Sequence, residues 1–291
     1  MAQAADPPDD ITFNAIVVAE SLSSLEMKTG SHLRDYINTL DEAPAKATLV
    51  QVASRDAFLA LLRDLETQVQ TRGLLPVLHL EAHGDENSGI WFADDSNLSW
   101  DDFCDAMTPL NIATGMRLLV TVAACYGGSL ISGIRLSKPA PCFALVGPSH
   151  RIDESEVMGS FRDFYGAMLR TLAAGPAIAA LRGHTLREGD LHVMTARRWF
   201  ELLMTQYLQT EATPRRVRDF ALRHYLNARM KSQSTLSMRD YKRLFRRELP
   251  VVVRKYFETF FAITDADRHP RYRALWSRLS ALLDQIRWSH S

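Results

Sequence analysis

Two apolar runs, each ending in a reactive side chain, constrain the fold of this 291-residue chain more than any other feature. The first run, residues 75–82, ends at His83 and Gly84, and the second, residues 116–124, ends at Cys125. Continuous apolar runs of this length are typical of parallel strands that helices cover on both faces. The carboxyl ends of such strands line one edge of an open α/β sheet, where ligands bind. We therefore expect His83 and Cys125 at the same edge of one sheet.

The rest of the first two thirds of the chain alternates between short apolar runs and amphipathic segments. This alternation predicts a mostly parallel sheet with helices on both faces, a three-layer α/β/α sandwich. Besides the two runs above, we expect strands at residues 11–19, 47–53 and 142–147, and helices at residues 32–40, 54–70, 99–109, 128–136 and 155–172.

Three regions follow from the sequence pattern. Residues 1–10 are rich in Ala, Pro and Asp, and we expect them to be disordered. Residues 11–185 form the α/β domain, and residues 186–291 form a mostly helical C-terminal region. Residues 191–195 remain open as a short sixth strand.

Composition points to a reducing compartment. No apolar run reaches the length of a membrane span, and no charged-then-apolar leader opens the sequence. The three cysteines, Cys104, Cys125 and Cys142, are too few for a disulfide framework. We therefore expect a cytoplasmic protein.

The net charge of zero hides an asymmetry along the chain. Residues 1–183 carry 13 Lys and Arg against 23 Asp and Glu, whereas residues 184–291 carry 21 against 11. Either the two parts dock on each other, or the basic part recruits an acidic regulatory or effector partner. Nucleic-acid binding is a weaker interpretation, because the aromatic residues among the basic pairs have the spacing of a helical core stripe. They are Tyr241, Phe245, Tyr256 and Phe257.

The pairing of a cysteine with a histidine predicts nucleophilic catalysis. Cys125 ends a strand just before an expected helix, whose free N–H groups and dipole favour a thiolate. His83 would act as general acid and base. The backbone N–H groups of Gly84 and Cys125 would form an oxyanion hole. The structural alternative is a small apolar residue at Cys125 and a purely structural histidine at His83.

Metal binding is the other chemistry to weigh. His79, Glu81 and His83 alternate, so on one strand they share a face and could bind zinc. Helices should cover both faces of that strand, so we expect no metal and a hydrogen-bonded core histidine at His79. Glu81 would orient a histidine, or pair with a cation or a helix N-terminus. A zinc deaminase motif fails, because Leu145 stands where its second cysteine is required.

The two strand-end motifs, Ala82-His83-Gly84 and Ala124-Cys125-Tyr126-Gly127, resemble those of caspase-like cysteine peptidases. That group includes caspases, metacaspases, separase and the bacterial CHAT-domain proteases. The separation from residue 83 to residue 125 is 42 residues, and Ala123 stands where caspases have a glutamine. Residues 161–169 also resemble the Phe-x-x-x-Phe-Tyr helix of CHAT domains. The resemblance covers roughly residues 10 to 185.

The resemblance implies a caspase-like fold and a cysteine endopeptidase with a His83–Cys125 dyad that needs no cofactor. It also implies a protein substrate. Some bacterial members of the group cleave a gasdermin-like pore-former or another effector in antiviral defence. The alternatives are a non-catalytic caspase-like interaction or scaffold module, and a different thiol hydrolase on a similar sheet.

Acidic residues dominate the expected strand-end loops. A buried carboxylate there would favour a basic substrate residue before the cleaved bond. Metacaspases place such an aspartate two residues before the cysteine, but Ala123 stands at that position. We therefore expect Asp153 first, with Asp85 and Glu86, to bind the substrate; Glu20 and Glu154 are the other acids, against Lys28 and Arg151. The alternative is that all these acids are solvated and the pocket is apolar.

Overall fold

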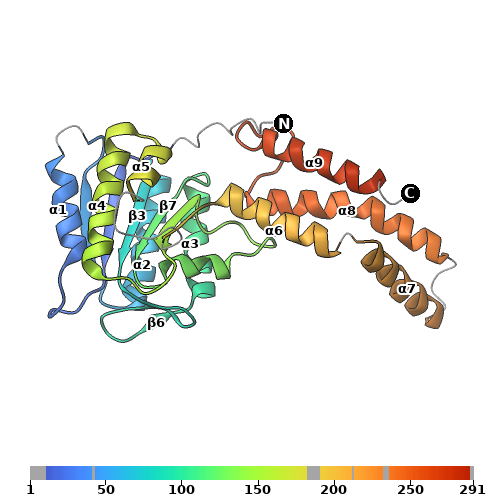
Figure 1. Cartoon of the computed structure of the whole chain (residues 1–291), viewed down its shortest axis with the longest axis horizontal. Coiled ribbons are helices and arrows are strands. Elements are labelled where there is room, and N and C mark those ends of the chain that lie inside the picture. Colours follow the sequence, from blue (N-terminus) through green and yellow to red (C-terminus); the bar gives the residue numbers. More distant parts are fainter. Residues whose placement is uncertain (1–10, 41–42, 182–190, 212, 232–235, 289–291) are drawn as a thin grey trace. The chain divides into compact units, whose positions relative to one another are not determined.

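The computed structural model describes residues 11–40, 43–181, 191–211, 213–231 and 236–288 (Figure 1). The expected disordered segment, residues 1–10, lies outside this part of the chain. The chain divides into two compact units. Unit 1 comprises residues up to Ile134 together with Ala140–Ala196, and unit 2 comprises Arg135–Pro139 and the residues from Arg197 onward. No helix in the described ranges has the length and apolar character that crossing a membrane requires.

A six-stranded, mostly parallel sheet forms the centre of unit 1, as the alternating pattern predicts. Its order is β2-β1-β3-β7-β8-β9, and only β9 is antiparallel to its neighbour. The strands are β1 (Ala15–Glu20), β2 (Ala47–Gln51), β3 (Pro76–Glu81), β7 (Leu119–Ala123), β8 (Ala144–Pro148) and β9 (Leu191–Thr195). The two runs that end in reactive residues are therefore neighbouring strands, β3 and β7.

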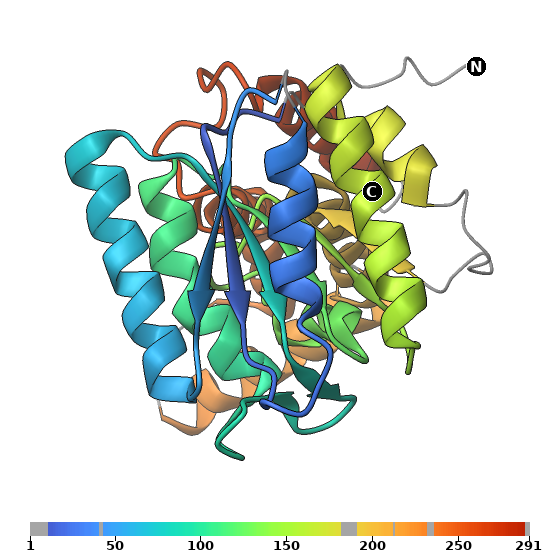
Figure 2. The same cartoon turned by 90° about the vertical axis from the view of Figure 1, so that its left-hand side faces the viewer.

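Helices cover both faces of this sheet and make three layers (Figure 2). On one face α1 (Thr29–Thr39) packs beside α4 (Glu154–Thr171), which is followed by α5 (Ala174–Leu181). On the other face α2 (Arg55–Arg72) packs beside α3 (Trp100–Ala113). All six residues of β3 and all five of β7 are buried, as expected for strands between two helical layers.

A small second sheet follows β3. It consists of β4 (His83–Asp85), β5 (Gly89–Trp91) and β6 (Asn97–Leu98), all antiparallel. The turn between β4 and β5 is fixed by Asp85, whose carboxylate accepts hydrogen bonds from the backbone N–H groups of Asn87 and Ser88. The small sheet therefore begins at His83, directly after β3.

Polar residues buried beneath the sheet edge satisfy one another. The His79 ring lies 2.9 Å from Glu81 Oε1 and 2.7 Å from Thr121 Oγ1, and it is completely buried. Glu81 accepts a hydrogen bond from the Thr29 hydroxyl at the start of α1, and the Tyr165 hydroxyl contacts Thr121 at 2.8 Å. Buried polar groups require such partners. The prediction of a hydrogen-bonded core histidine at His79 is confirmed.

Two expected helices differ from the prediction. The helix expected to end near Pro109 continues to Ala113, because Asn111 beyond the proline is buried and hydrogen-bonded to Leu118 and Ala140. The helix expected at residues 128–136 is a 3-10 helix, η1 (Gly127–Gly133).

The boundary between the units lies near residue 196 and not near residue 185. The reason is β9, which pairs with β8 along its whole length and therefore belongs to the sheet of unit 1. The possible sixth strand at residues 191–195 is thus confirmed. Residues 182–190, where the expected boundary fell, lie outside the described part of the chain.

Unit 2 is helical, with a core of aromatic side chains. Its helices are α6 (Ala196–Glu211), α7 (Pro214–Met230), α8 (Met238–Phe260) and α9 (Arg273–Trp288). The ring of Phe200 on α6 lies 5.2 Å from that of Phe257 and 5.3 Å from that of Phe260, both on α8. Phe257 also lies 5.2 Å from Trp276 on α9. Aromatic pairs at these separations stabilise a core beyond their buried area.

The aromatic residues interleaved with basic pairs pack inside this bundle. Tyr241 and Phe257 are buried. Phe245 contacts Phe220 at a ring separation of 5.0 Å, and Tyr256 contacts Tyr207 at 5.6 Å. These contacts favour the core-stripe interpretation over a stacking surface for bases.

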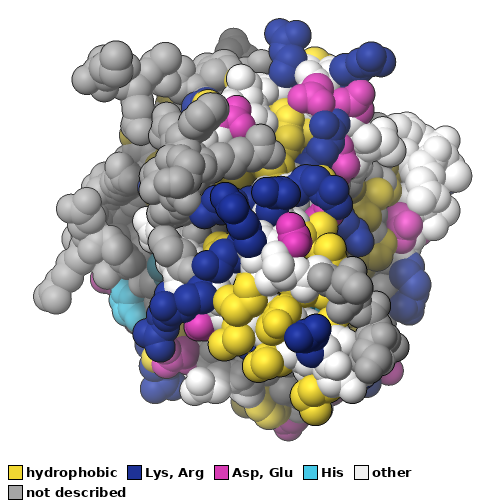
Figure 3. Space-filling view, turned by 90° about the vertical axis from the view of Figure 1, so that its right-hand side faces the viewer, with side chains coloured by type: hydrophobic (Ala, Val, Ile, Leu, Met, Phe, Trp, Pro, Cys, Tyr) yellow, Lys and Arg dark blue, Asp and Glu magenta, His cyan; other side chains and the backbone are white. Residues whose placement is uncertain are grey.

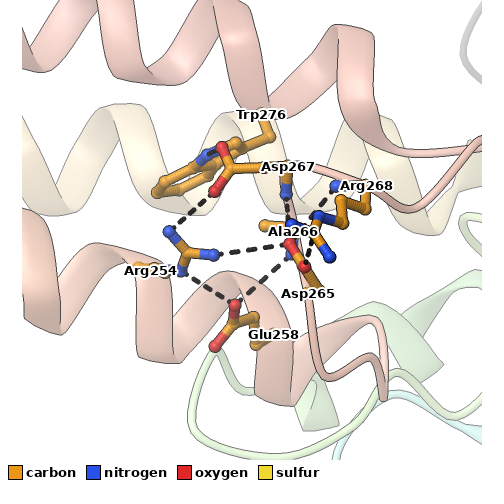
Figure 4. A network of polar contacts seen from close by, with 7 residues as sticks. All are labelled: Arg254, Glu258, Asp265, Ala266, Asp267, Arg268 and Trp276. Carbon is orange, nitrogen blue, oxygen red and sulfur yellow. Dashed lines mark hydrogen bonds and ion pairs between the residues drawn. The ribbon is translucent and has the colours of Figure 1, made fainter.

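One arginine organises the connection between α8 and α9 (Figure 4). The Arg254 guanidinium lies 2.9 Å from Glu258, 2.9 Å from Asp267 and 3.6 Å from Asp265. The Trp276 indole N–H donates to Asp267 at 2.8 Å, and the guanidinium lies 5.7 Å from the Trp276 ring centre. The hydrogen bond to Glu258, together with the hydrogen bond to Asp267 and the charges of these two carboxylates, raises the pKa of Arg254 although partial burial opposes it. A single cation thus holds three carboxylates and one ring together.

We expect Arg254→Met to destabilise unit 2 by about 1 kcal/mol, the upper end for exposed ion pairs, because solvent screens a side chain that is 40% exposed. The loss arises because Glu258 and Asp267 lose their cation, while Asp265 keeps its contact with Arg268 at 3.6 Å. Thermal unfolding of the full chain measures it. The control is Arg247→Met, whose side chain is 75% exposed and pairs with the adjacent Glu248. Equal melting temperatures for the two variants would contradict this role of Arg254.

Candidate functional site

The His83 and Cys125 segments are in direct backbone contact. Strands β3 and β7 pair in parallel with Glu81 opposite Ala123, so both chains leave the sheet at the same edge. A Cβ atom at Gly84 would lie 2.1 Å from the carbonyl oxygen of Cys125. Such an approach excludes every side chain, so glycine is required at this position by contact and not by its backbone angles.

The turn that carries Cys125 has an unusual backbone. Tyr126 adopts a left-handed conformation with φ of 58°, and its N–H donates to the carbonyl of His150. A residue other than glycine pays about 1–2 kcal/mol for this conformation, and such residues cluster at functional sites. The backbone N–H of Cys125 has no acceptor among the described residues. It is therefore available to a substrate carbonyl.

The Cys125 thiol is half-buried and lies 3.8 Å from the carbonyl oxygen of Ile152. No hydrogen bond joins it to the His83 ring in the described part of the chain. Catalytic hydrogen bonds are often long in a free enzyme and shorten when substrate binds. The expected stabilisation of a Cys125 thiolate depended on the dipole of a helix at residues 128–136. The structure has the seven-residue 3-10 helix η1 there instead.

His83 is held by a carboxylate that sequence reasoning missed. Its Nε2 lies 2.6 Å from Oε1 of Glu26, in the loop between β1 and α1. The other Glu26 oxygen accepts a hydrogen bond from the Ser23 N–H at 2.6 Å. Glu26 could have been found from its place after β1, because the loop following a strand next to β3 reaches the same edge of the sheet.

Glu26 is ionised when it faces His83. Partial burial opposes the charge, but hydrogen bonds from Ser23 and the nearby His83 outweigh it and hold the pKa of Glu26 below its ordinary value of 4.5. A lowered pKa in the folded state means that the interaction contributes to stability above pH 4.5 and is lost as the pH falls through the lowered value. The carboxylate is therefore present throughout the neutral range.

The possible zinc ligands do not share a site. His79 and Glu81 point into the buried cluster between β3 and the first helical layer, whereas His83 belongs to the small sheet and pairs with Glu26. The described residues contain no group of three or more His, Cys, Asp or Glu side chains arranged for a metal ion. Glu81 orients the buried His79 and bonds the start of α1, and no hydrogen bond joins it to His83 among the described residues.

The acids expected to bind substrate are exposed and serve local structure. Asp153 is the N-cap of α4, and hydrogen bonds from the Ser155 hydroxyl and N–H lower the pKa of Asp153. Hydrogen bonds from Ser88 and Asn87 likewise lower the pKa of Asp85. Glu86 is exposed beside them. The buried carboxylate on which a basic specificity depended is therefore not found among these three residues.

Glu20, another of the acids expected at the strand ends, is buried, and residues of α1 and β2 donate hydrogen bonds to both of its oxygens. One of its oxygens accepts the Ser31 N–H at 3.0 Å, and the other accepts the Gln51 side-chain amide at 2.6 Å. It is the last residue of β1 and not a loop residue as expected.

The other two cysteines are buried away from solvent. Burial raises the pKa of the Cys142 thiol to about 12, and the Cys104 thiol donates to the carbonyl of Leu130. All three cysteines are free thiols. Cys125 is thus the accessible thiol of the three.

No protein-family model matches this sequence, and a search of the curated proteins finds no match to it either. Function is therefore inferred from the chemistry of the site.

We expect iodoacetamide to alkylate Cys125 at least about a hundredfold faster than Cys142 at pH 8, because a thiol with a pKa near 12 is only about one part in ten thousand ionised at that pH. Peptide mapping by mass spectrometry over a time course measures the three rates. Cys104 provides the matched buried control. Equal labelling of all three thiols in the folded chain would contradict the expectation that Cys125 is the accessible, reactive thiol.

Proposed function

We propose that this protein is a cysteine endopeptidase in which Cys125 is the nucleophile, His83 the general acid and base, and Glu26 the residue that positions His83. The observation that carries the proposal is the contact of Gly84 with the Cys125 backbone, which places the Glu26–His83 pair beside the thiol segment. A nucleophile, a base and a carboxylate that orients the base are the elements of nucleophilic hydrolysis.

Each step of the proposed reaction has a residue to perform it. Cys125 loses its proton to His83, and Sγ attacks the peptide carbonyl carbon. The oxygen that becomes negative is stabilised by the N–H groups of Cys125 and Gly84. His83 then gives the proton to the leaving amine as the C–N bond breaks, which leaves a thioester on Cys125. Water, deprotonated by His83, hydrolyses the thioester and releases the new carboxylate.

Glu26 contributes to these reaction steps through its contact with His83. The imidazole becomes positively charged when it takes the thiol proton, and a carboxylate at 2.6 Å stabilises that charge and fixes the ring. Because Nε2 faces Glu26, Nδ1 is the ring nitrogen left for proton transfer; it has no partner among the described residues.

The resemblance of the two strand-end motifs to caspase-like peptidases supports the finer assignment to that group, and the resemblance of residues 161–169 to a CHAT-domain helix supports a CHAT-like member. On that basis we propose a protein substrate, such as a gasdermin-like pore-former or another effector in antiviral defence, and no cofactor. Three free thiols support a reducing compartment such as the cytoplasm.

We expect Cys125→Ala to abolish peptide cleavage and His83→Ala to lower kcat by about 10²–10⁴-fold, the usual contribution of general acid–base catalysis. Glu26→Gln should lower kcat at least about tenfold with little change in KM, and Glu26→Asp should restore part of it. Steady-state kinetics on an intact protein substrate that carries quenched fluorescent labels measure these changes.

The control for Glu26→Gln is Glu66→Gln, which changes a half-buried glutamate on α2 that accepts a hydrogen bond from Gln70. Full activity in the Cys125→Ala variant would refute the enzyme and favour a non-catalytic scaffold. A loss in Glu26→Gln that appears in KM alone would show that Glu26 does not position His83.

For unit 2 we propose a docking role toward an acidic, amphipathic segment of a partner protein. Lysine and arginine side chains gather around exposed apolar side chains on one face of the molecule (Figure 3). On α7 the exposed apolar residues Leu222, Leu226 and Met230 follow one another at intervals of four, so they share one helix face. Arg223 and Arg229 are exposed beside them. Apolar anchors within a basic rim fit a helix with leucines and flanking glutamates.

We expect the double variant Arg223→Glu, Arg229→Glu to weaken binding of such a peptide at least about tenfold, and added salt to weaken binding to the parent chain. The probe is a fluorescent peptide with leucines at every fourth position and flanking glutamates, titrated against the full chain by anisotropy. The control variant is Arg55→Glu in unit 1. Equal binding of a scrambled peptide, or tighter binding to duplex DNA or anionic vesicles, would contradict the proposal.

A further inference from the structure

Exposed apolar side chains concentrate around His83. In the described part of unit 1, five large apolar residues are more than one third exposed, and three of them lie beside the His83–Glu26 pair. These three are Leu25, Met27 and Trp91, and Leu25 is 97% exposed. Single exposed apolar residues are ordinary on a protein surface, but a group of them at a reactive site indicates binding.

The backbone places all three residues next to the reactive groups. Leu25 and Met27 flank Glu26, whose carboxylate contacts His83. Trp91 lies directly opposite His83 in the antiparallel pair β4–β5. Directly opposite residues in such a pair project to the same face with Cβ atoms about 4.5–5.5 Å apart. The Trp91 and His83 side chains therefore leave the backbone on the same face of the small sheet.

The Trp91 side chain is fixed before any ligand arrives. Its indole N–H donates to the Ser88 hydroxyl at 2.9 Å, and that hydroxyl donates to the Asp85 carboxylate at 2.9 Å. The Trp100 indole in turn donates to the backbone carbonyls of Asp85 and Glu86, which holds the turn against α3. An aromatic ring whose position is already set loses little conformational entropy when it binds. Asp85 thus supports the ring and does not face a substrate cation.

We propose that Leu25, Met27 and Trp91 form an apolar subsite that receives a large apolar side chain of the peptide substrate close to the cleaved bond. This inference rests on the proposed endopeptidase function and names its substrate class. The neighbouring acids already have partners: Asp85 and Asp153 are exposed and bonded within their own turn and helix cap, and the buried Glu20 and Glu81 bond α1 and residues of the sheet. Recognition at this edge is therefore by apolar contact and aromatic stacking.

The test is the cleavage pattern of the full chain on a complex peptide library, read by mass spectrometry. The expected result is an excess of Leu, Ile, Met or Phe within two positions of the cut, relative to the library. For one peptide from that set, Trp91→Ala should lower kcat/KM at least about tenfold, mainly through KM, since it removes binding and not chemistry. The rate of Cys125 alkylation should stay within about twofold, because the variant leaves the catalytic groups in place.

The control variant is Ile112→Ala, which truncates an exposed apolar residue on α3 and should leave kcat/KM unchanged. Cuts beside Arg or Asp, at the same rate in the parent chain and in Trp91→Ala, would overturn the apolar subsite and leave the endopeptidase intact. A parent chain that cleaves no library peptide would overturn the endopeptidase and this inference together.

Discussion

The parallel pairing of β3 with β7 is the constraint on which the site depends. It sets Glu81 opposite Ala123 and so brings two chain segments that are 42 residues apart out of the sheet at one point. The backbones of Gly84 and Cys125 then lie in contact, so close that no side chain fits between Gly84 and the Cys125 carbonyl. The reactive residues lie just beyond the regular strands, where loops can adopt the angles that chemistry requires and the strands supply the rigidity.

Buried carboxylates connect this edge to the loop that carries Glu26. Glu20 and Glu81 end two adjacent strands, and both bond the first turn of α1, through the Ser31 N–H and the Thr29 hydroxyl. Negative groups at a helix N-terminus are stabilising. They fix where α1 begins and therefore where the loop before it ends. Lys28 closes the loop from within by donating to the carbonyls of Leu22 and Ser23. The contacts of Glu20, Glu81 and Lys28 thus fix the loop that carries Glu26, the partner of His83.

The elements that sequence reasoning found are those with a local signature. Apolar runs identified β3 and β7, and the position of His79 inside such a run predicted a buried, bonded histidine. Glu26 was missed because its contact with His83 spans 57 residues and depends on the strand order, which no local pattern encodes. The local sequence left two roles open for Asp153. An aspartate two residues before Ser155 can be a helix cap or a substrate ligand, and the structure shows the cap of α4.

The most direct test of the central claim is to trap the acyl-enzyme. The full chain is mixed with an activated ester of a leucine peptide, quenched in acid within milliseconds to seconds, and its intact mass is measured. The account predicts a mass increase equal to the acyl group, located on the peptide that contains Cys125 and absent from Cys125→Ala. It also predicts slower formation of this adduct in His83→Ala. An adduct on another residue, or equal acylation of the Cys125→Ala chain, would contradict the assignment of Cys125 and His83 as the reacting pair.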